Sequence, residues 1–194
     1  ATIITISHRG FIKRTPAVDY RTQGRGGKGL KGMETRDAST EEEEDDFVEH
    51  LFSGTAHDYL LFFTNTGRVY VRRVHEIPDM GRAAKGRNIA NLLELQSGEK
   101  IAALIRVESQ LGDNKENLTW KQDKFLFFAT ESGTVKKTAL EAYSNVRRNG
   151  INAIGINEGD RLITVKLTTG HDEVVLITNA GLSIRFNEEN VRSM

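Results

Sequence analysis

The chain has 194 residues, no cysteine, and 27 basic and 27 acidic side chains, so its formal net charge at pH 7 is zero. The absence of cysteine excludes a disulfide scaffold and a thiolate metal site, and a balanced charge argues against a nucleic-acid-binding protein, which usually has a basic excess. No apolar run approaches the roughly 18 residues of a membrane-spanning helix, and the sequence does not begin with a signal-peptide pattern. We therefore expect a cytoplasmic protein with no membrane partner.

The charged side chains are not mixed evenly along the chain. Residues 1–37 contain eight basic and three acidic residues, whereas residues 38–58 contain eight acidic residues and no basic one. Six of these acids form the run Glu41–Asp46. The zero net charge is a cancellation between segments, and it does not by itself exclude DNA as a partner.

Four strand–turn–strand segments recur along the chain, each with a Ser/Thr-x-x-Gly turn. The expected first strands are Ile3–Ile6, Leu60–Phe63, Leu126–Ala129 and Val174–Ile177. The turns end at Gly10, Gly67, Gly133 and Gly181, and the expected second strands are Phe11–Thr15, Arg68–Arg72, Thr134–Thr138 and Leu182–Phe186. Glycine suits the last turn position, where a hairpin loop often requires a positive φ. Four copies of one turn indicate an internal repeat.

Two further strands are expected in the second repeat and two in the third. They are Ile89–Leu95 with Ile101–Val107, and Ile151–Ile156 with Leu162–Leu167. The second strand of each pair follows a matched turn, either Gly98-Glu99-Lys100 or Gly159-Asp160-Arg161. Four-stranded units repeated at roughly 40–50 residues predict an all-β, propeller-like array of four-stranded blades.

The repeats divide the chain into four units of one partial domain. Their approximate limits are 1–57, 58–123, 124–171 and an incomplete 172–194, which gives about three and a half blades. The spacing is uneven because residues 33–46 and 108–123 are polar insertions, and loop insertions add closure entropy only slowly with length.

A basic loop that ends in glycine lies between the second and third strands of a repeat. Counted from the turn glycine, offsets 15 to 19 read Arg25-Gly26-Gly27-Lys28-Gly29 in the first repeat and Arg82-Ala83-Ala84-Lys85-Gly86 in the second. The third repeat retains Arg147-Arg148-Asn149-Gly150. Positive charge, exposed amides and residues without a Cβ suit close contact with DNA phosphates. Nothing resembles a base-reading helix, so recognition of DNA shape is expected.

Basic residues also recur on the second strands, and repetition around an axis would bring them to one rim. The candidate DNA-binding rim consists of Lys13, Arg14, Arg21, Arg72, Arg73, Arg82, Lys85, Arg87, Lys136, Lys137, Arg147, Arg148 and Arg185. Taken singly, a basic strand residue is more often a solubilising group or a protection of a strand edge.

One segment of the first repeat reads Gln23-Gly24-Arg25-Gly26-Gly27-Lys28-Gly29. It resembles the basic box of the C-terminal domain of the DNA gyrase A protein, in the type IIA topoisomerase family. The resemblance covers essentially all 194 residues, including Gly67-Arg68-Val69-Tyr70, Gly133-Thr134-Val135-Lys136-Lys137-Thr138 and Val191-Arg192-Ser193-Met194. The family box usually has a second arginine where this chain has Gly24, so one positive charge is missing here.

The resemblance implies a six-bladed β-pinwheel that bends and wraps double-stranded DNA around its rim without sequence specificity. It further implies a non-catalytic domain that supports ATP-dependent negative supercoiling, with the rest of the gyrase A protein and with the gyrase B protein as partners, on the bacterial nucleoid. No cofactor, metal ligand or catalytic residue is expected in this chain, since ATP and Mg belong to other parts of the holoenzyme. The implied DNA-binding box consists of Gln23, Gly24, Arg25, Gly26, Gly27, Lys28 and Gly29, with Arg25 and Lys28 as its anchor.

Three alternatives remain beside this interpretation. The matching C-terminal domain of topoisomerase IV is the nearest, although its box is usually degraded and the box here matches at six of seven positions. A β-propeller protein-interaction platform would explain the repeat but not the box. A nucleotide-binding enzyme would need the Gly24-x-Gly26-x-x-Gly29 spacing to follow a buried strand and to open a helix, and it does neither.

The acidic run Glu41–Asp46 has two interpretations. It is either a solvated loop or a mimic of phosphate that competes with DNA for the basic rim.

Overall fold

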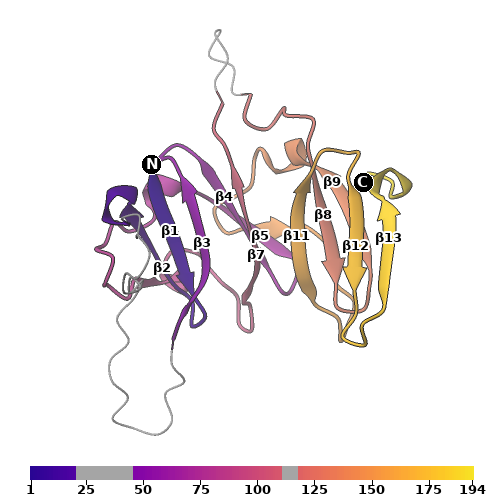
Figure 1. The fold of residues 1–194 in the computed structure, drawn as a ribbon, viewed down its shortest axis with the longest axis horizontal. Coiled ribbons are helices and arrows are strands. Elements are labelled where there is room, and N and C mark those ends of the chain that lie inside the picture. The colour runs from indigo at the N-terminus through magenta and orange to yellow at the C-terminus, as the bar shows by residue number, and fades with distance from the viewer. Residues whose placement is uncertain (21–45, 111–117) are drawn as a thin grey trace, which may run out of the picture. The chain divides into compact units, whose positions relative to one another are not determined.

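The computed structural model describes residues 1–20, 46–110 and 118–194, which form antiparallel β-sheets joined by turns (Figure 1). Within these ranges there is no α-helix, and the helical turns are the 3-10 segments η1 (Ala17–Asp19), η2 (Val74–Glu76), η3 (Ile89–Asn91), η4 (Leu140–Tyr143) and η5 (Glu188–Asn190). None of the helices in the described part of the chain is long and apolar enough to cross a membrane. The all-β class expected from the sequence is confirmed.

Contacts between residues divide the chain into two compact units. Compact unit 1 comprises Ala1–Tyr59 and Arg72–Leu95, and compact unit 2 comprises Leu60–Val71 and Gln96–Met194. Both units draw on more than one repeat, so chain segments that are distant in sequence complete each other's sheets.

Compact unit 1 holds one four-stranded sheet, in the order β3-β1-β2-β6. Its strands are β1 (Thr2–Ser7), β2 (Phe11–Pro16), β3 (Val48–Gly54) and β6 (Arg87–Asn88). β1 pairs with β2 from Thr2↔Pro16 to Ile6↔Ile12. Strand β2 is therefore central, with a neighbour along each edge.

The remaining sheets, in the orders β10-β5-β4-β7, β11-β8-β9 and β12-β13, lie mostly in compact unit 2, although Tyr59, Arg72 and Arg73 at the ends of two strands belong to compact unit 1. Their strands are β4 (Tyr59–Thr64), β5 (Arg68–Arg73), β7 (Ile101–Val107), β8 (Phe125–Thr130), β9 (Val135–Ala139), β10 (Ile151–Asn152), β11 (Leu162–Thr168), β12 (Glu173–Ile177) and β13 (Ser183–Asn187). All four glycine-turn hairpins expected from the sequence are present, since β1 pairs with β2, β4 with β5, β8 with β9 and β12 with β13. The glycine that ends each turn adopts a φ between 79° and 89°.

The fourth strand of each four-stranded sheet comes from the next repeat. Strand β6 pairs with β2 through Phe11↔Asn88 and Ile12↔Arg87, and β10 pairs with β5 through Ile151↔Val69 and Asn152↔Arg68. A four-stranded sheet therefore combines three strands of one repeat with a two-residue strand of its successor.

Neither of the two expected third strands is a strand over most of its length. In the predicted strand Ile89–Leu95, the amides of Leu92 and Leu93 both donate to the Ile89 carbonyl and form a helical turn. The apolar residues at spacing three and four bury one face of this turn, with Ile89 and Leu93 in the core. In Ile151–Ile156, the strand ends at Asn152, because the amides of Ala153 and Ile154 both turn to the Gly67 carbonyl.

Strand β3 was not expected from the sequence. It pairs with β1 along its whole length, from Thr2↔Gly54 to Ser7↔Val48, and it takes the outer position that β7 and β11 occupy in the other sheets. Burial alternates along β3, but the sequence does not show it, because Phe47 and Leu51 are apolar and exposed whereas His50 is polar and half-buried.

The cores are built from the first hairpin strands. In compact unit 2, Leu60 to Phe63 are fully buried, and the Phe63 ring meets the Phe128 and Tyr143 rings edge to face at centroid distances of 5.4 and 6.1 Å. Burying a phenylalanine stabilises the fold by about 1.5–3 kcal/mol. In compact unit 1, Ile4 and Ile6 of β1 are buried in the corresponding positions, and Ile12 of β2 is buried as well.

Candidate nucleic-acid interface

The DNA-binding box expected at Gln23–Gly29 lies outside the described residues, as does Arg21. The equivalent segment of the second repeat, Gly81–Gly86, is described, and we call it the second-repeat loop. It presents Arg82, half-buried, and Lys85, exposed, and the exposed Arg87 follows on β6. The loop and the start of β6 therefore display three of the expected basic rim residues.

The second-repeat loop is fastened to β2 on both sides. Before the loop, the Met80 amide donates to the Arg14 carbonyl at 3.0 Å. After it, the Ile89 amide donates to the Gly10 carbonyl at 2.8 Å. The Lys85 ammonium also lies 4.3 Å from the centroid of the Phe11 ring, within the range of a cation–π contact. Phe11, which directly follows a turn glycine, was not among the expected site residues.

Gly86 is required by packing against β2. Its φ is 103°, and a Cβ at this position would lie 2.9 Å from the Ile12 carbonyl oxygen. Gly150 ends the segment Arg147–Gly150, which we call the third-repeat loop; it has a φ of 80°, and a Cβ there would also lie 2.9 Å from a backbone oxygen, the Val69 carbonyl. Glycine at these two positions is therefore required by packing within the fold, besides the close approach to phosphate that the sequence predicts for the loop glycines.

Lys13 lies in the interior and not at the surface position expected of a rim residue. It is 1% exposed, and its ammonium donates to the carbonyl oxygens of Gly81 at 3.3 Å, Ala84 at 2.6 Å and Arg82. Burial lowers the pKa of Lys13, and the nearby Arg82 guanidinium lowers it further. Lys13 is buried because the segment from Gly81 to Ala84 lies over its side chain.

Arg14 and Arg72 also bind backbone carbonyls. The half-buried Arg14 donates from Nε to the Ile77 carbonyl at 2.7 Å and forms an ion pair with Asp79 at 3.5 Å. Arg72 is 2% exposed and donates from Nε to the Leu92 carbonyl at 3.1 Å. Both side chains therefore bind the backbone on either side of the second-repeat loop, whereas the sequence predicts them at a surface rim.

The two lysines on the second strand of the third repeat also differ in their exposure to solvent. Lys137 is 6% exposed, donates to the Glu188 carbonyl at 3.0 Å and lies 5.0 Å from the Phe125 ring centroid. Lys136 is half-buried and donates to the Ala153 carbonyl at 2.9 Å. Lys137 thus occupies an interior position, and Lys136 an intermediate one.

The other expected rim residues that the structure describes are at least partly accessible. Arg73 donates to the His57 carbonyl at 2.8 Å and lies 4.0 Å from the Tyr59 ring centroid. Arg185 is exposed and paired with Glu173. In the third-repeat loop, Arg147 and Arg148 are exposed.

A residue outside the expected set holds the third-repeat loop. The Arg68 guanidinium donates to the Asn149 carbonyl at 2.7 Å. Arg68 directly follows the turn glycine Gly67, so its place in the repeat was the available signal. Arg68 therefore binds the backbone of the third-repeat loop, as Lys13 binds the backbone of the second-repeat loop.

Polar contacts also fasten hairpin turns to the residues that precede the outer strand. In the first repeat, an Asp46 carboxylate oxygen accepts the Arg9 amide at 2.9 Å. In the third, Asp160 accepts the Ser132 amide at 3.0 Å and its hydroxyl at 2.5 Å. Hydrogen bonds from Ser132, then from Thr130, hold the pKa of Asp160 below its usual range. Asp46 is therefore a structural residue, whereas the rest of the run Glu41–Asp46 lies outside the described residues.

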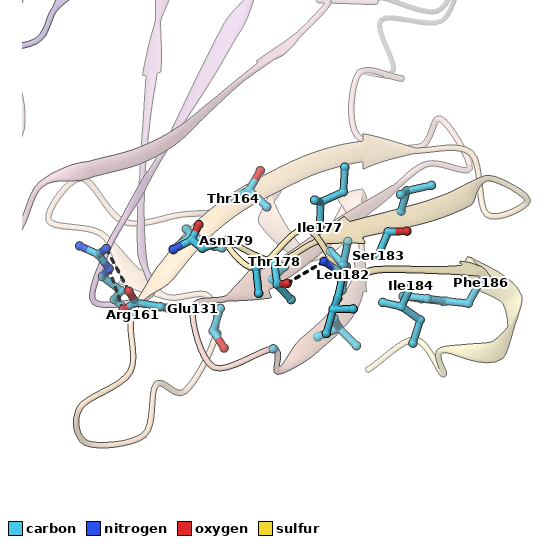
Figure 2. Close-up of a pocket in the computed structure, with 18 residues that line it drawn as sticks. Glu131, Arg161, Thr164, Ile177, Thr178, Asn179, Leu182, Ser183, Ile184 and Phe186 are labelled. Carbon is cyan, nitrogen blue, oxygen red and sulfur yellow. Dashed lines mark hydrogen bonds and ion pairs between the residues drawn. The ribbon is translucent and has the colours of Figure 1, made fainter.

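A hollow beside β12 and β13 has a different character from the basic loops (Figure 2). Apolar side chains dominate its lining, including the exposed Ile163, Val175, Ile177, Leu182 and Ile184. Its one arginine, Arg161, is paired with Glu131 at 2.9 Å. Nothing in this lining suits the binding of phosphates. Across residues 1–20, 46–110 and 118–194, no cluster of three or more acidic, histidine or cysteine side chains is placed to hold a metal ion.

Comparison with known proteins gives a family match over most of the chain. The model of the DNA gyrase C-terminal domain, beta-propeller, matches residues 1–53, 58–108, 124–169 and 172–194. The chain is 42% identical to the DNA gyrase A protein of Clostridium acetobutylicum and 44% identical to that of Halalkalibacterium halodurans, each over 192 residues. These alignments cover 99% of this chain and 21% of each relative, so the chain spans about a fifth of their length.

Solved structures show the same fold. The chain matches the C-terminal domain of DNA topoisomerase IV with a TM-score of 0.74 and 27% identity, covering 100% of this chain and 53% of that one. It matches the DNA gyrase A C-terminal domain with a TM-score of 0.69 and 24% identity, covering 100% of this chain and 56% of that one. With the family model matching each of the four repeats, this chain belongs to the DNA gyrase C-terminal domain family.

Proposed function

We propose that this chain binds and bends duplex DNA, without sequence specificity, as the wrapping domain of a DNA gyrase A protein. The observation that carries the proposal is the recurrence of Arg-x-x-Lys-Gly at one offset from the turn glycine, at Arg25–Gly29 and at Arg82–Gly86. Recurrent cations on a repeat scaffold suit a ligand that is itself a repeat of phosphates.

The proposed contact set follows from accessibility. The box Gln23–Gly29 is its centre, with Arg25 and Lys28 as the anchor. The accessible candidates are Arg73, Arg82, Lys85, Arg87, Lys136, Arg147, Arg148 and Arg185, together with Arg21, which lies outside the described residues. The buried Lys13, Arg72 and Lys137 and the carbonyl-bound Arg14 are proposed to support this surface.

In the complete enzyme, wrapping would present a neighbouring duplex segment for passage through the double-strand break. The remainder of the gyrase A protein, the gyrase B protein and ATP would then convert each wrap into negative supercoils. This role belongs in the bacterial cytoplasm, on the nucleoid. The matching domain of topoisomerase IV remains the second candidate, favoured by the TM-score of 0.74 to that structure, but the box at six of seven positions favours gyrase.

The test uses the full-length gyrase A protein that carries this domain, assembled with the gyrase B protein. Arg25→Ala combined with Lys28→Ala is expected to abolish negative supercoiling, because the wrap loses its anchor, while relaxation of supercoiled plasmid is retained. The matched control is Lys121→Ala combined with Lys166→Ala, which removes two exposed lysines outside the proposed contact set. An unchanged rate of supercoiling in the first double variant would refute the proposal, and no affinity of the wild-type enzyme for duplex DNA at low salt would favour a protein-interaction platform.

A further inference from the structure

Lys13 is the side chain that holds the backbone of the second-repeat loop. Its three donors are directed to the carbonyl oxygens of Gly81, Arg82 and Ala84, which lie between 68 and 71 residues further along the chain. The chain on either side of the loop is tied to β2 by backbone hydrogen bonds of Arg14 and Gly10. Within the loop, all three hydrogen bonds to β2 come from the Lys13 ammonium group, and the contact of Lys85 with the Phe11 ring adds to them, so the loop conformation depends largely on Lys13.

The identity of this residue is not required by the sheet. The same offset from the turn glycine is occupied by Tyr70, Lys136 and Ile184 in the other three repeats. Burial of an ammonium group carries a desolvation penalty that an apolar side chain avoids, and the hydrogen bonds offset it only where the geometry is good. Charge-assisted hydrogen bonds to three carbonyls supply that geometry here. A buried lysine at this position is therefore explained by the loop and not by the sheet.

The Lys13 ammonium also interacts electrostatically with a charged side chain of the loop. The Arg82 guanidinium is close enough to lower the pKa of Lys13, which means that the two positive charges repel. Lys13 is fixed by its carbonyl ligands, whereas Arg82 is half-buried and has access to solvent. Repulsion from a fixed charge disfavours a closer approach of the Arg82 guanidinium to the Lys13 ammonium, and a phosphate beside Arg82 would be attracted by both cations.

We propose that Lys13 is a positioning residue for DNA binding, which holds the second-repeat loop so that Arg82 and Lys85 meet the same duplex. This inference rests on the proposed function, and it adds that a buried residue of the first repeat controls a contact made by the second. Lys13 itself would touch no phosphate.

The experiment is a double-mutant cycle in the full-length gyrase A protein, read as affinity for a linear duplex over a range of salt concentrations. Loss of one phosphate contact changes the slope of log K against log salt by about 0.9, which corresponds to roughly tenfold in affinity at 0.1 M salt. Arg82→Ala is expected to show that loss, and Lys13→Met at least the same loss. Lys166→Met, which removes an exposed lysine of β11, is the matched control and should leave both slope and affinity unchanged.

The decisive comparison is Lys13→Met in the Arg82→Ala background. If Lys13 acts through the loop, the second substitution adds much less than it does alone, and amide hydrogen exchange of residues 82–86 in the DNA-free protein becomes faster. Independent, additive effects with unchanged exchange would overturn the proposal, as would wild-type affinity in Lys13→Met.

A second variant covers the case in which methionine impairs folding. Lys13→Gln keeps N–H donors without the charge, so it should retain more affinity and slower loop exchange than Lys13→Met. An equal loss in the two variants would contradict a hydrogen-bonding role. If Arg82→Ala itself leaves DNA affinity unchanged, or the wild-type enzyme binds no duplex, it is the proposed function that fails.

Discussion

At the scale of single residues, glycines with a similar backbone conformation have different structural roles. Gly98 and Gly86 both have a positive φ, of 79° and 103°. A Cβ at Gly98 would meet no atom within 4 Å, whereas one at Gly86 would meet the Ile12 carbonyl oxygen at 2.9 Å. Gly98 thus serves only the backbone conformation of its turn, and Gly86 also allows the loop to lie against β2.

Gly86→Ala is accordingly expected to destabilise the protein more than Gly98→Ala. The left-handed conformation costs a non-glycine residue about 1–2 kcal/mol, and both variants incur this term. Gly86→Ala adds a contact with backbone atoms of β2, which are unable to move aside without disturbing the sheet. Urea denaturation of the two variants measures the difference in the free energy of unfolding, and equal losses would show that Gly86 has no packing role.

At the scale of elements, the sheets depend on short polar links between turns. The hairpin turn at Ser132 is tied through Asp160 to the turn that precedes β11. The hairpin turn at Asn65 is tied to the residue before β7, because the Asn65 side chain accepts the Lys100 amide at 2.9 Å. These links fix the outer strand against the hairpin at one end, which determines the register of the pair.

The Asp160 link has a defined pH dependence. The pKa of Asp160 is lowered by hydrogen bonds from Ser132, so the folded state favours the carboxylate. Its contribution is therefore present above the ordinary aspartate pKa of about 3.9 and is lost as the pH falls below that value. In Asp160→Asn, the free energy of unfolding should therefore fall less steeply as the pH is lowered through this range, and Ser132→Ala should weaken the same pH dependence to a smaller extent. Urea denaturation between pH 6 and pH 2.5 at constant ionic strength measures both effects. An acid limb identical to wild type in Asp160→Asn would exclude the link as its source.

At the scale of the whole molecule, the location of charge matters more than its sum. The formal charge is zero because the run Glu41–Asp46 and other acids offset the basic residues. Asp46 is separate from the rest of that run, since its buried carboxylate accepts the Arg9 and Phe47 amides. Any test of the run as a competitor of DNA must therefore leave Asp46 in place.

Replacing residues 41–45 by glutamine and asparagine removes five negative charges and leaves the Asp46 contacts intact. If the run mimics phosphate, this variant of the full-length gyrase A protein should bind duplex DNA more tightly at low salt, and the difference should shrink as salt screens the charges. Titration of a labelled duplex at about 0.05 and about 0.3 M salt gives both values. Unchanged affinity at low salt would identify the run as a solvated loop.

The sequence by itself determined the repeat, the four glycine-turn hairpins, the all-β class and the basic loops, because these features depend on local signals: alternation of apolar residues, a positive φ at glycine, and clustered charge. It did not determine the β6 strand, the two-residue length and the partner of β10, or the outer strand β3, because their pairing partners lie far away in the sequence. It also did not separate buried from accessible basic residues. An alternating strand pattern assigns side chains to two faces, but it does not reveal that both faces are covered. Lys13 is interior because a loop 68 to 71 residues later folds over it, and only the tertiary structure decides that contact.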